Sequence, residues 1–386
     1  MLTVFHMLGG VAAAASLVGI AYMLMAIVAT WRFARRRTVT PRYCPSVTIL
    51  RPVCGADAGL YENLASFCRQ AYAGPVQIVI GAHRETDPAV AIARQVIADL
   101  PEADITLVID AALAGSNFKV CNLANMMVAA KHEILVLADS DMRVEPHYLD
   151  AVVGPLLEPG VGLVTCLYKG TPAGGLSSVL GCGAINYGFL PSVLVGSTIG
   201  AETGSFGATI ALRRATLDTI GGFEALINQL ADDYILGALV RALGLKVVVS
   251  RYIVENVVNE PDLPSLFRHE LRWQRTIRGI TPPLWLAGQI VTNPLAMALL
   301  ALPLTGFTGG AWLILTASLA ARLGVVYTSR FALGLAPMGV GLVPVRDCLS
   351  FAIFVASFLG QRVTWRESSF QVGRDGELTF EGDPLA

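Results

Sequence analysis

Charged residues are scarce in this chain of 386 residues. They make up 15% of the sequence, whereas hydrophobic residues make up 54%. The 28 basic residues nearly balance the 29 acidic ones, so there is no overall positive field that would attract nucleic acid. The composition excludes nucleic acid as the expected partner and indicates a protein associated with the lipid bilayer.

Paired cysteines and glycine-rich phosphate loops are also missing. The seven cysteines show no C-x-x-C spacing, which argues against a zinc site and a disulfide framework. Where a dinucleotide or P-loop signature would follow the first expected strand, the sequence reads RPVCGADAGL. A nucleotide diphosphate held by this chain would therefore need a divalent cation for much of its charge neutralisation.

An uncharged run from Met7 to Trp31 predicts an N-terminal membrane anchor, because it is long enough to cross a hydrocarbon core of about 30 Å. No basic segment precedes it and no small-residue cleavage pattern follows, so we expect it to be retained. Five arginines come next: Arg32, Arg35, Arg36, Arg37 and Arg42. By the positive-inside rule they place the following domain in the cytoplasm, and we expect an integral protein of a bacterial inner membrane.

Two further apolar runs lie near the C-terminus. The run from Gly279 to Ala321 is long enough for two passes if the chain turns between Pro303 and Gly310. The run from Phe331 to Gly360 is interrupted by Arg346 and Asp347, so we expect it to lie in the interface or to span imperfectly. The tail after it is expected in the cytoplasm because it carries three arginines: Arg362, Arg366 and Arg374.

The middle of the chain alternates short apolar runs with helical patterns. Strands are expected over residues 46–53, 76–82, 103–110 and 133–140, and helices over 60–71, 87–100 and 119–132. This alternation predicts an α/β domain with a mostly parallel sheet that is covered on both faces. The expected division is an anchor and basic segment over 1–44, a cytosolic domain over 45–283, membrane or interfacial helices over 284–362 and a cytosolic tail over 363–386.

Two carboxylates, Asp139 and Asp141, come directly after the last of these strands in the sequence LADSD. In an extended chain, residues two apart point to the same side, so the pair could converge on one ion. Carboxylate oxygens suit Mg²⁺ or Mn²⁺, which typically adds substrate phosphate oxygens to one or two carboxylates. A solvated turn after a strand is the alternative explanation.

Two more motifs allow both a structural and a functional interpretation. Asp232 and Asp233 begin the helical pattern of ADDYILGALV, where they could cap the helix or supply a general base. The segment FRHELRWQRTIRG contains Arg272 and Trp273 in a basic patch just before a membrane run. It could attract anionic lipid or clamp a diphosphate.

The order of these motifs along the chain resembles that of the inverting, membrane-bound GT-A glycosyltransferases, closest to the ceramide glucosyltransferases. The resemblance is carried by TDP, SNFKVCNL, DSD, GSFGATIALRRATLDTIGGF, ADDY and HELRW, and it continues to WRESSFQV in the tail. It implies a GT-A nucleotide-diphospho-sugar transferase domain over 45–283 with transmembrane helices at both ends. The implied activity is transfer of a sugar, with glucose expected, from a UDP-sugar to the hydroxyl of a membrane lipid such as ceramide, with a metal and with inversion.

The resemblance also implies positions for the donor. Asp87 is implied to contact the nucleoside of the UDP-sugar, with Lys119 and Asn122 nearby. Asp139 and Asp141 are implied to hold Mg²⁺ or Mn²⁺ against the diphosphate, with Asp139 also counted among the nucleotide-sugar contacts.

The implied catalytic residues come later in the chain. Asp233 is implied as the base that deprotonates the acceptor hydroxyl, with Asp232 beside it. Arg272 and Trp273 are implied to close the site over the diphosphate or the acceptor. The motif departs from the family at His269, where Gln or Arg is usual, and a different acceptor head group would be one reason.

The acceptor is the least determined part of the prediction. The uncharged stretch from Gly170 to Ala201 fits either a core helix and loop or an interfacial surface that admits a lipid hydroxyl. A bacterial branch of similar enzymes glycosylates hopanoid lipids, and that alternative would use UDP-N-acetylglucosamine. A processive polysaccharide synthase would need more spans than are expected here. A non-catalytic nucleotide-sugar-binding membrane protein would not need the complete acidic set.

Overall fold

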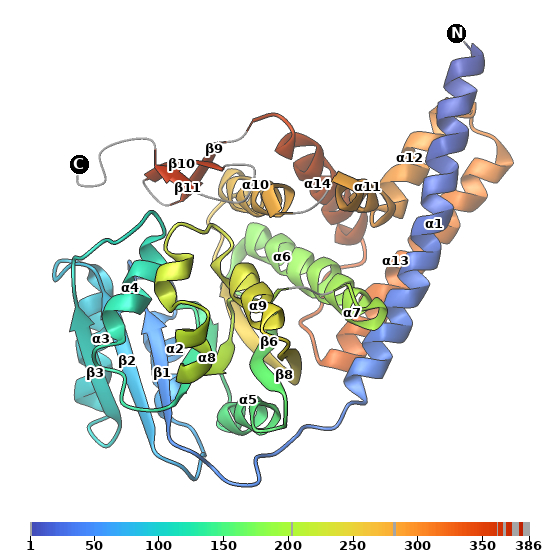
Figure 1. The fold of residues 1–386 in the computed structure, drawn as a ribbon. Coiled ribbons are helices and arrows are strands. Elements are labelled where there is room, and N and C mark those ends of the chain that lie inside the picture. Colours follow the sequence, from blue (N-terminus) through green and yellow to red (C-terminus); the bar gives the residue numbers. More distant parts are fainter. Residues whose placement is uncertain are drawn as a thin grey trace. The chain divides into compact units, whose positions relative to one another are not determined.

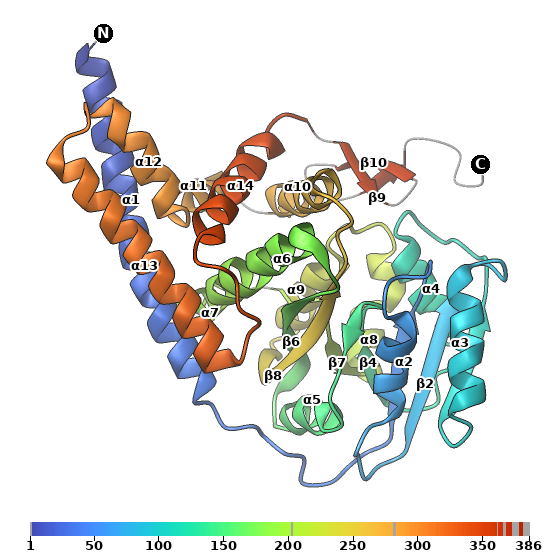
Figure 2. The same ribbon diagram turned by 180° about the vertical axis from the view of Figure 1, so that it is seen from behind.

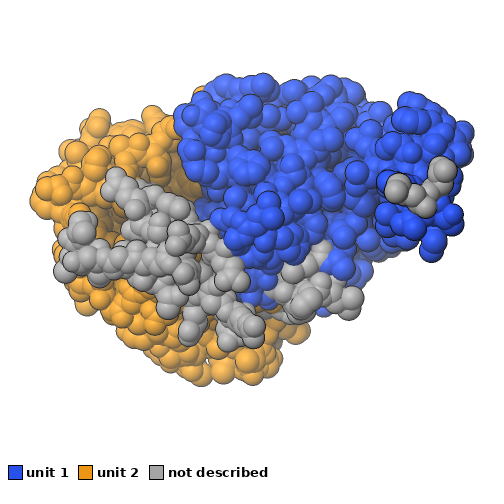
Figure 3. All heavy atoms as spheres, turned by 90° about the horizontal axis from the view of Figure 1, so that it is seen from above, with its two compact units in different colours: residues 1–36, 174–202, 260–367 blue, residues 37–173, 203–259, 368–386 orange. Residues whose placement is uncertain are grey.

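A computed structural model of the chain describes residues 2–201, 204–280, 283–360, 362–365, 368–372 and 378–380. The chain divides into two compact units (Figure 3). Unit 1 comprises Met1–Arg36, Gly174–Glu202 and Glu260–Glu367, and unit 2 comprises Arg37–Ala173, Thr203–Asn259 and Ser368–Ala386. Each unit is thus assembled from three separate segments of the chain. Arg366 and Arg374 of the expected tail lie outside the described residues.

Unit 2 is built on a sheet of eight strands in the order β3-β2-β1-β4-β7-β6-β8-β5 (Figure 1). The strands are β1 (Val47–Pro52), β2 (Val76–Ala82), β3 (Asp104–Ile109), β4 (Ile134–Leu137), β5 (Met142–Arg143), β6 (Val161–Pro172), β7 (Ile210–Arg213) and β8 (Lys246–Val258). Strands β1 to β4 pair in parallel, as do β6 and β8, whereas β7 is antiparallel to both of its neighbours. The prediction of a mostly parallel α/β sheet is confirmed.

Alternating side chains bury both faces of this sheet. In β1, Val47 and Ile49 belong to one hydrophobic core and Leu50 to the other, as expected from the period of two in a strand. Helices α2 (Leu60–Cys68), α3 (Pro88–Asp99) and α5 (Tyr148–Leu156) cover the first face, and α4 (Phe118–Met126), α8 (Arg214–Thr219), the 3₁₀ helix η2 (Phe223–Leu226) and α9 (Asp232–Ala242) cover the second (Figure 2). Each fully buried aliphatic side chain contributes about 1.5–3 kcal/mol to this packing.

Helix α4 is shorter than its apolar pattern predicts. The pattern continues to residue 132, but the helix ends at Met126. Beyond the helix, the backbone forms hydrogen bonds with the buried side chain of Gln77 on β2. Nε2 of Gln77 donates to the backbone carbonyl of Ala129, and Oε1 of Gln77 accepts from the backbone amide of Lys131, both at 2.9 Å. Competition from a buried side chain therefore stops the helix, and a local pattern cannot show this.

Unit 1 is mainly helical. Its helices are α1 (Leu2–Ala34), α6 (Gly175–Ala184), the π-helical turn η1 (Ile185–Phe189), α7 (Leu190–Ile199), α10 (Leu263–Ile280), α11 (Pro283–Val291), α12 (Pro294–Leu304), α13 (Gly309–Leu333) and α14 (Leu342–Ser357). Helices α1 and α13 lie side by side, and the hydroxyls of Ser16 and Ser318 are 2.8 Å apart between them (Figures 1 and 2). Three short strands follow: β9 (Arg362–Trp365), β10 (Ser368–Val372) and β11 (Leu378–Phe380), the last two in unit 2, where they pair antiparallel.

Three helical segments among the described residues have the length and apolar character needed to cross a membrane: Thr3–Ala34, Gly175–Ile199 and Gly309–Leu333. The first coincides with the run from Met7 to Trp31 that was expected as an N-terminal anchor, and anchoring itself stays a prediction. The second was expected only as a core helix or an interfacial surface. The expectation of two passes between Gly279 and Ala321 differs from the structure, because the first part breaks at residues 292–293 into two short helices, α11 and α12. The expected turn before residue 310 is present, since α12 ends at Leu304 and α13 begins at Gly309.

Helix α14 carries the two charges that interrupt the last apolar run, and both are buried in ion pairs. The Arg346 guanidinium makes two bonds, of 2.8 and 2.7 Å, to the carboxylate of Glu270 on α10. The Asp347 carboxylate accepts from Nε of Arg322 on α13 at 2.8 and 2.9 Å, and Arg322 also donates to the carbonyl of Tyr187 in the π-helical turn. Buried charges of this kind are tolerated because they are paired.

Candidate active site

The carboxyl end of β4 is where the predicted acids gather. Parallel strands end at the same edge of a sheet, and Asp139 comes two residues after the last residue of β4. Strand β7 runs antiparallel to β4 with Ile210 opposite Leu137, so the residues that precede β7, including Gly207, lie at the same edge. Helix α4 begins nearby with Lys119 in its first turn, and α9 begins with Asp232 and Asp233.

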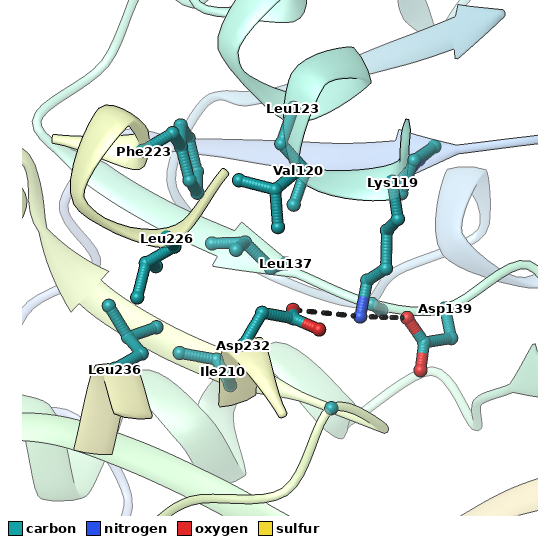
Figure 4. A pocket seen from close by; sticks show the side chains of 13 residues that line it. Lys119, Val120, Leu123, Leu137, Asp139, Ile210, Phe223, Leu226, Asp232 and Leu236 are labelled. Carbon is teal, nitrogen blue, oxygen red and sulfur yellow. Dashed lines mark ion pairs between the residues drawn. The ribbon is translucent and has the colours of Figure 1, made fainter. Parts of the chain in front are cut away.

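Lys119 joins two carboxylates that are far apart in the sequence. Its ammonium lies 2.8 Å from Oδ1 of Asp139 and 3.3 Å from Oδ2 of Asp232 (Figure 4). Burial alone would lower the pKa of Lys119, but three neighbouring carboxylates outweigh it and raise that pKa above its ordinary value. The ammonium is therefore charged throughout the physiological range. A small cavity of about 10 Å³, enough for about one water, adjoins these groups and is otherwise lined mainly by apolar side chains.

Asp233 is held by backbone amides. The amide of Gly207 donates to Oδ2 at 2.7 Å, and the amide of Tyr234 donates to Oδ1 at 2.8 Å. Burial first, and then the charge of Asp232, raise the pKa of Asp233 to about 6, although Lys119 and the two amides act in the opposite direction. A carboxylate with such a pKa is ionised at neutral pH and is more basic than an ordinary aspartate.

Asp141 occupies a different environment from Asp139. It lies just before β5, and its Oδ2 accepts a hydrogen bond of 2.7 Å from the side-chain amide of Asn256 on β8. Burial, followed by the charge of Asp139, raises the pKa of Asp141 to about 6. The charge of Asp139 contributes to this shift, so the two carboxylates act on each other electrostatically.

The structure places Asp87 and Asn122 in roles that also support the fold. Oδ1 of Asp87 caps α3 by accepting from the amide of Ala89 and accepts from the amide of Gly55, both at 2.8 Å. The side chain of Asn122 is buried, and it donates to the carbonyl of Gly81 on β2 at 2.8 Å. These contacts fasten α3 to the loop after β1 and α4 to β2 of the sheet, and contact of either side chain with a nucleotide stays a prediction.

Arg272 and Trp273 lie on α10 in unit 1, apart in the chain from the acids of unit 2. The ring of Trp273 meets the ring of His269 edge-on with centroids 4.5 Å apart. Nδ1 of His269 lies 2.6 Å from Oε1 of Glu260, whose side chain is buried. His269 is thus a packed and hydrogen-bonded residue, which is the role that a lone histidine most often has.

Arg51 beneath the acidic loop was missed by the sequence interpretation. It is fully buried on β1, and its Nη2 donates to the carbonyls of Ser140 and Met142 at 3.4 and 3.3 Å. Burial lowers its pKa to about 10, so it remains protonated at pH 7. The signal available in the sequence was an arginine inside the apolar strand TILRPV.

A divalent cation fits the donor set at this edge only together with substrate oxygens. Among the described residues, no group of three or more histidine, cysteine, aspartate or glutamate side chains is arranged to hold a metal by itself. Asp139 and Asp141 supply carboxylate oxygens, which Mg²⁺ and Mn²⁺ prefer, and a diphosphate would supply the remaining ligands.

Comparisons with known proteins cover most of the chain. Residues 11–378 match the family model described as glycosyl transferase family 21. Ceramide glucosyltransferase 1 of Caenorhabditis elegans is 24% identical over 348 residues, which cover 86% of this chain and 73% of that protein. A ceramide glucosyltransferase of Gibberella zeae is 32% identical over 134 residues, covering 32% of this chain and 25% of that protein.

One solved structure shares the fold over nearly its whole length. It is a mannosyltransferase from Pyrobaculum calidifontis in complex with GDP-mannose and Mn²⁺. The match has a TM-score of 0.52 and 18% identity, and it covers 91% of this chain and 99% of that one. At this identity the match shows the GT-A fold alone.

Proposed function

Because the chain belongs to glycosyl transferase family 21 and is a glycosyltransferase, we propose that it transfers glucose from a UDP-sugar to the hydroxyl of a membrane lipid such as ceramide. The observation that carries the proposal is the convergence of Lys119, Asp139, Asp232 and Asp233 at the carboxyl edge of β4. The similar proteins named as ceramide glucosyltransferases support the choice of a lipid acceptor.

The proposed reaction is a direct displacement at the anomeric carbon. The acceptor oxygen forms a bond to that carbon as the bond to the diphosphate breaks, and the electron pair leaves with UDP. The acceptor proton passes to the carboxylate of Asp233, whose pKa of about 6 suits a general base at neutral pH. Attack opposite the leaving group inverts the configuration and gives a β-linkage from an α-linked donor.

We assign the base to Asp233 rather than to Asp232. The ammonium of Lys119 lies 3.3 Å from Oδ2 of Asp232, and Nδ2 of Asn117 lies 3.5 Å from its Oδ1, so both oxygens of Asp232 already have partners. The amides of Gly207 and Tyr234 fix the orientation of Asp233, and each of its oxygens keeps a second lone pair for the acceptor.

The proposed donor site includes Mg²⁺ or Mn²⁺ held by Asp139 and Asp141. When bound, this cation would supply stabilisation of the charge that develops on the leaving diphosphate. Lys119 would bind the same diphosphate, and Asp87 and Asn122 would border the nucleoside. Arg272 and Trp273 of α10 are proposed to act on the diphosphate or the acceptor.

The proposed location is a bacterial inner membrane with unit 2 facing the cytoplasm. The described helix α1 ends at Ala34, and arginines surround and follow its end, which favours this orientation by the positive-inside rule. In a variant whose seven native cysteines are replaced by serine, a single cysteine introduced at Arg36 should react with a membrane-impermeant maleimide only after the cells are opened. Labelling of intact spheroplasts from the outside would contradict the orientation.

The test of the activity is transfer by the full-length chain in lipid nanodiscs. Radiolabelled UDP-glucose and UDP-N-acetylglucosamine would each be offered with ceramide or with a hopanoid, in Mg²⁺, Mn²⁺ or EDTA. We expect labelled ceramide from UDP-glucose with metal, and NMR of the product should show the β-anomer. Labelled hopanoid from UDP-N-acetylglucosamine alone would replace the proposed substrates by the alternative pair.

Two variants separate the site from the scaffold. Asp139→Asn should abolish the metal-dependent transfer. Asp104→Asn should retain it, because Asp104 begins β3 and pairs there with the exposed Lys131, outside the cluster of Lys119 and its carboxylates. Full turnover in EDTA, or in Asp139→Asn, would remove the metal from the mechanism.

A further inference from the structure

The acidic cluster is short of positive charge. We define it as Asp139, Asp232 and Asp233 with the ammonium of Lys119, so three carboxylates face one ammonium and the formal charge is −2. Asp139 follows β4, whereas Asp232 and Asp233 are adjacent at the start of α9, and Asp139, Asp233 and Lys119 come near one point beside Gly207. A Cβ atom at Gly207 would lie 3.1 Å from Oδ2 of Asp139, 3.3 Å from Oδ2 of Asp233 and 3.4 Å from Nζ of Lys119.

Lys119 is attached loosely by comparison with the other cation near this loop. Arg51 is fully buried, lies 3.9 Å from the ring centre of Phe67 and binds two backbone carbonyls, so its position is fixed. Lys119 is a point charge on a flexible stem, and among the described residues its ion pairs are those to Asp139 and Asp232. It also lies in the first turn of α4, where the helix dipole disfavours a cation. Its position is therefore set by the carboxylates.

The two ion pairs of Lys119 differ in length and in the proposed role of the carboxylate. Asp139 is the nearer partner at 2.8 Å and is also the residue proposed to bind metal, whereas Asp232 at 3.3 Å is not. Asp232 is kept in place independently, because it begins α9 and lies 3.5 Å from Nδ2 of the buried Asn117. Release of Asp139 would thus leave Lys119 with one carboxylate partner and with hydrogen-bonding capacity to spare.

We propose that Lys119 is an exchangeable counter-cation of this site: it neutralises Asp139 while no donor is bound, and it releases Asp139 to the divalent cation that arrives with the UDP-sugar, turning its ammonium to the diphosphate. This inference rests on the proposed function. Lys119 competes with the divalent cation for one carboxylate and cooperates with the nucleotide. The site consequently binds metal weakly by itself and binds metal and donor together.

The exchange predicts opposite effects of one substitution on two ligands. Lys119→Met in the full-length chain should bind Mn²⁺ alone about tenfold more tightly, because a competing cation a few ångströms away is gone. The same variant should bind UDP at saturating Mn²⁺ at least about tenfold more weakly, because a charge-assisted contact to the diphosphate is lost. Free Mn²⁺ measured by electron paramagnetic resonance reports the first affinity, and isothermal titration with UDP reports the second.

Matched variants make the result decisive. Lys131→Met removes a lysine that pairs with Asp104 at 2.9 Å on the surface, and it should leave both affinities unchanged. Lys119→Gln provides a second neutral side chain if Lys119→Met does not fold, and Lys119→Arg should keep Mn²⁺ binding near that of the wild type. Unchanged or weaker binding of Mn²⁺ alone in both neutral variants would overturn the exchange. Full Mn²⁺ binding in Asp139→Asn would overturn the proposed metal site itself, and the exchange with it.

Discussion

The guanidinium of Arg51 lies 3.9 Å from the ring centre of Phe67, and both side chains are fully buried beneath the loop that carries Asp139 and Asp141. The contact places one fixed positive charge behind two carboxylates. It also leaves Nε and Nη1 of Arg51 without a hydrogen-bond partner among the described residues. This cation therefore depends on the ring and on two loop carbonyls for its stability.

We expect Arg51→Met to lower the free energy of unfolding by about 2–4 kcal/mol, because it removes the hydrogen bonds to Ser140 and Met142 and leaves the acidic loop without its buried cation. Phe67→Leu should cost less, about 1–2 kcal/mol, since the bonds to the loop remain. Urea unfolding followed by circular dichroism measures both. Equal stability of Arg51→Met and the wild type would show that the loop does not need this residue.

The pH dependence of transfer should report Asp233. Its pKa is raised to about 6, so its basic form predominates at pH 7 by about ten to one and is lost as the pH falls through 6. Below about pH 6 we expect kcat/KM for the acceptor to fall by about tenfold per pH unit. A divalent cation nearby lowers this pKa, so saturating metal should move the acid limb to lower pH and never to higher pH.

Asp233→Asn is the control for that profile. It should reduce kcat by at least about 10²-fold, because the general base is gone, and its residual activity should lack the acid limb. If Asp233→Asn keeps the limb of the wild type, another group titrates and the base has been assigned wrongly.

Gly207→Ala should impair the site while the fold survives. The added methyl group would lie 3.1 Å from Oδ2 of Asp139 and close to the oxygens and ammonium of the cluster, so these groups must move by a few tenths of an ångström. We expect transfer to fall by about 10-fold or more, since displacements of this size misalign reacting groups. Gly10→Ala is a suitable control because a Cβ atom there meets nothing within 4 Å. Wild-type kinetics in Gly207→Ala would show that the cluster tolerates the shift.

The ion pair between Arg346 and Glu270 should behave as a buried pair. Glu270→Gln or Arg346→Met breaks the double contact of 2.7 and 2.8 Å and should cost about 3–5 kcal/mol, because one buried charge is left alone. The double variant Glu270→Met/Arg346→Met should recover most of that loss. Thermal unfolding in detergent of the two single variants and the double variant gives the coupling energy. Additive losses would mean that the two residues do not stabilise each other.

Sequence patterns were most reliable where burial is periodic. The strands over 76–82 and 103–110 were predicted within a residue of their ends, because apolar side chains alternate between two cores there. The place of Asp139 after β4 followed from the same logic. The pattern could not reveal the ion pair of Lys119 with Asp232, since the two residues are 113 positions apart in the sequence. Only the folded sheet brings the start of α4, which carries Lys119, close to the start of α9, which carries Asp232.

The membrane part was less predictable for a related reason. Hydropathy alone did not distinguish a buried core helix from a span over Gly175–Ile199, because both are apolar. The charges at Arg346 and Asp347 read as interruptions of a span, although their partners, on α10 and α13, neutralise them. Whether each charge is buried in an ion pair depends on a residue in another helix, so the local sequence cannot predict it.

The adjacent charges of α14 also constrain how the chain is synthesised. Arg322 precedes its partner Asp347 by 25 residues, so the arginine emerges from the ribosome well before the carboxylate that neutralises it. Until Asp347 has been made, Arg322 on α13 lacks its buried partner, so we expect α13 and α14 to be stable only as a pair.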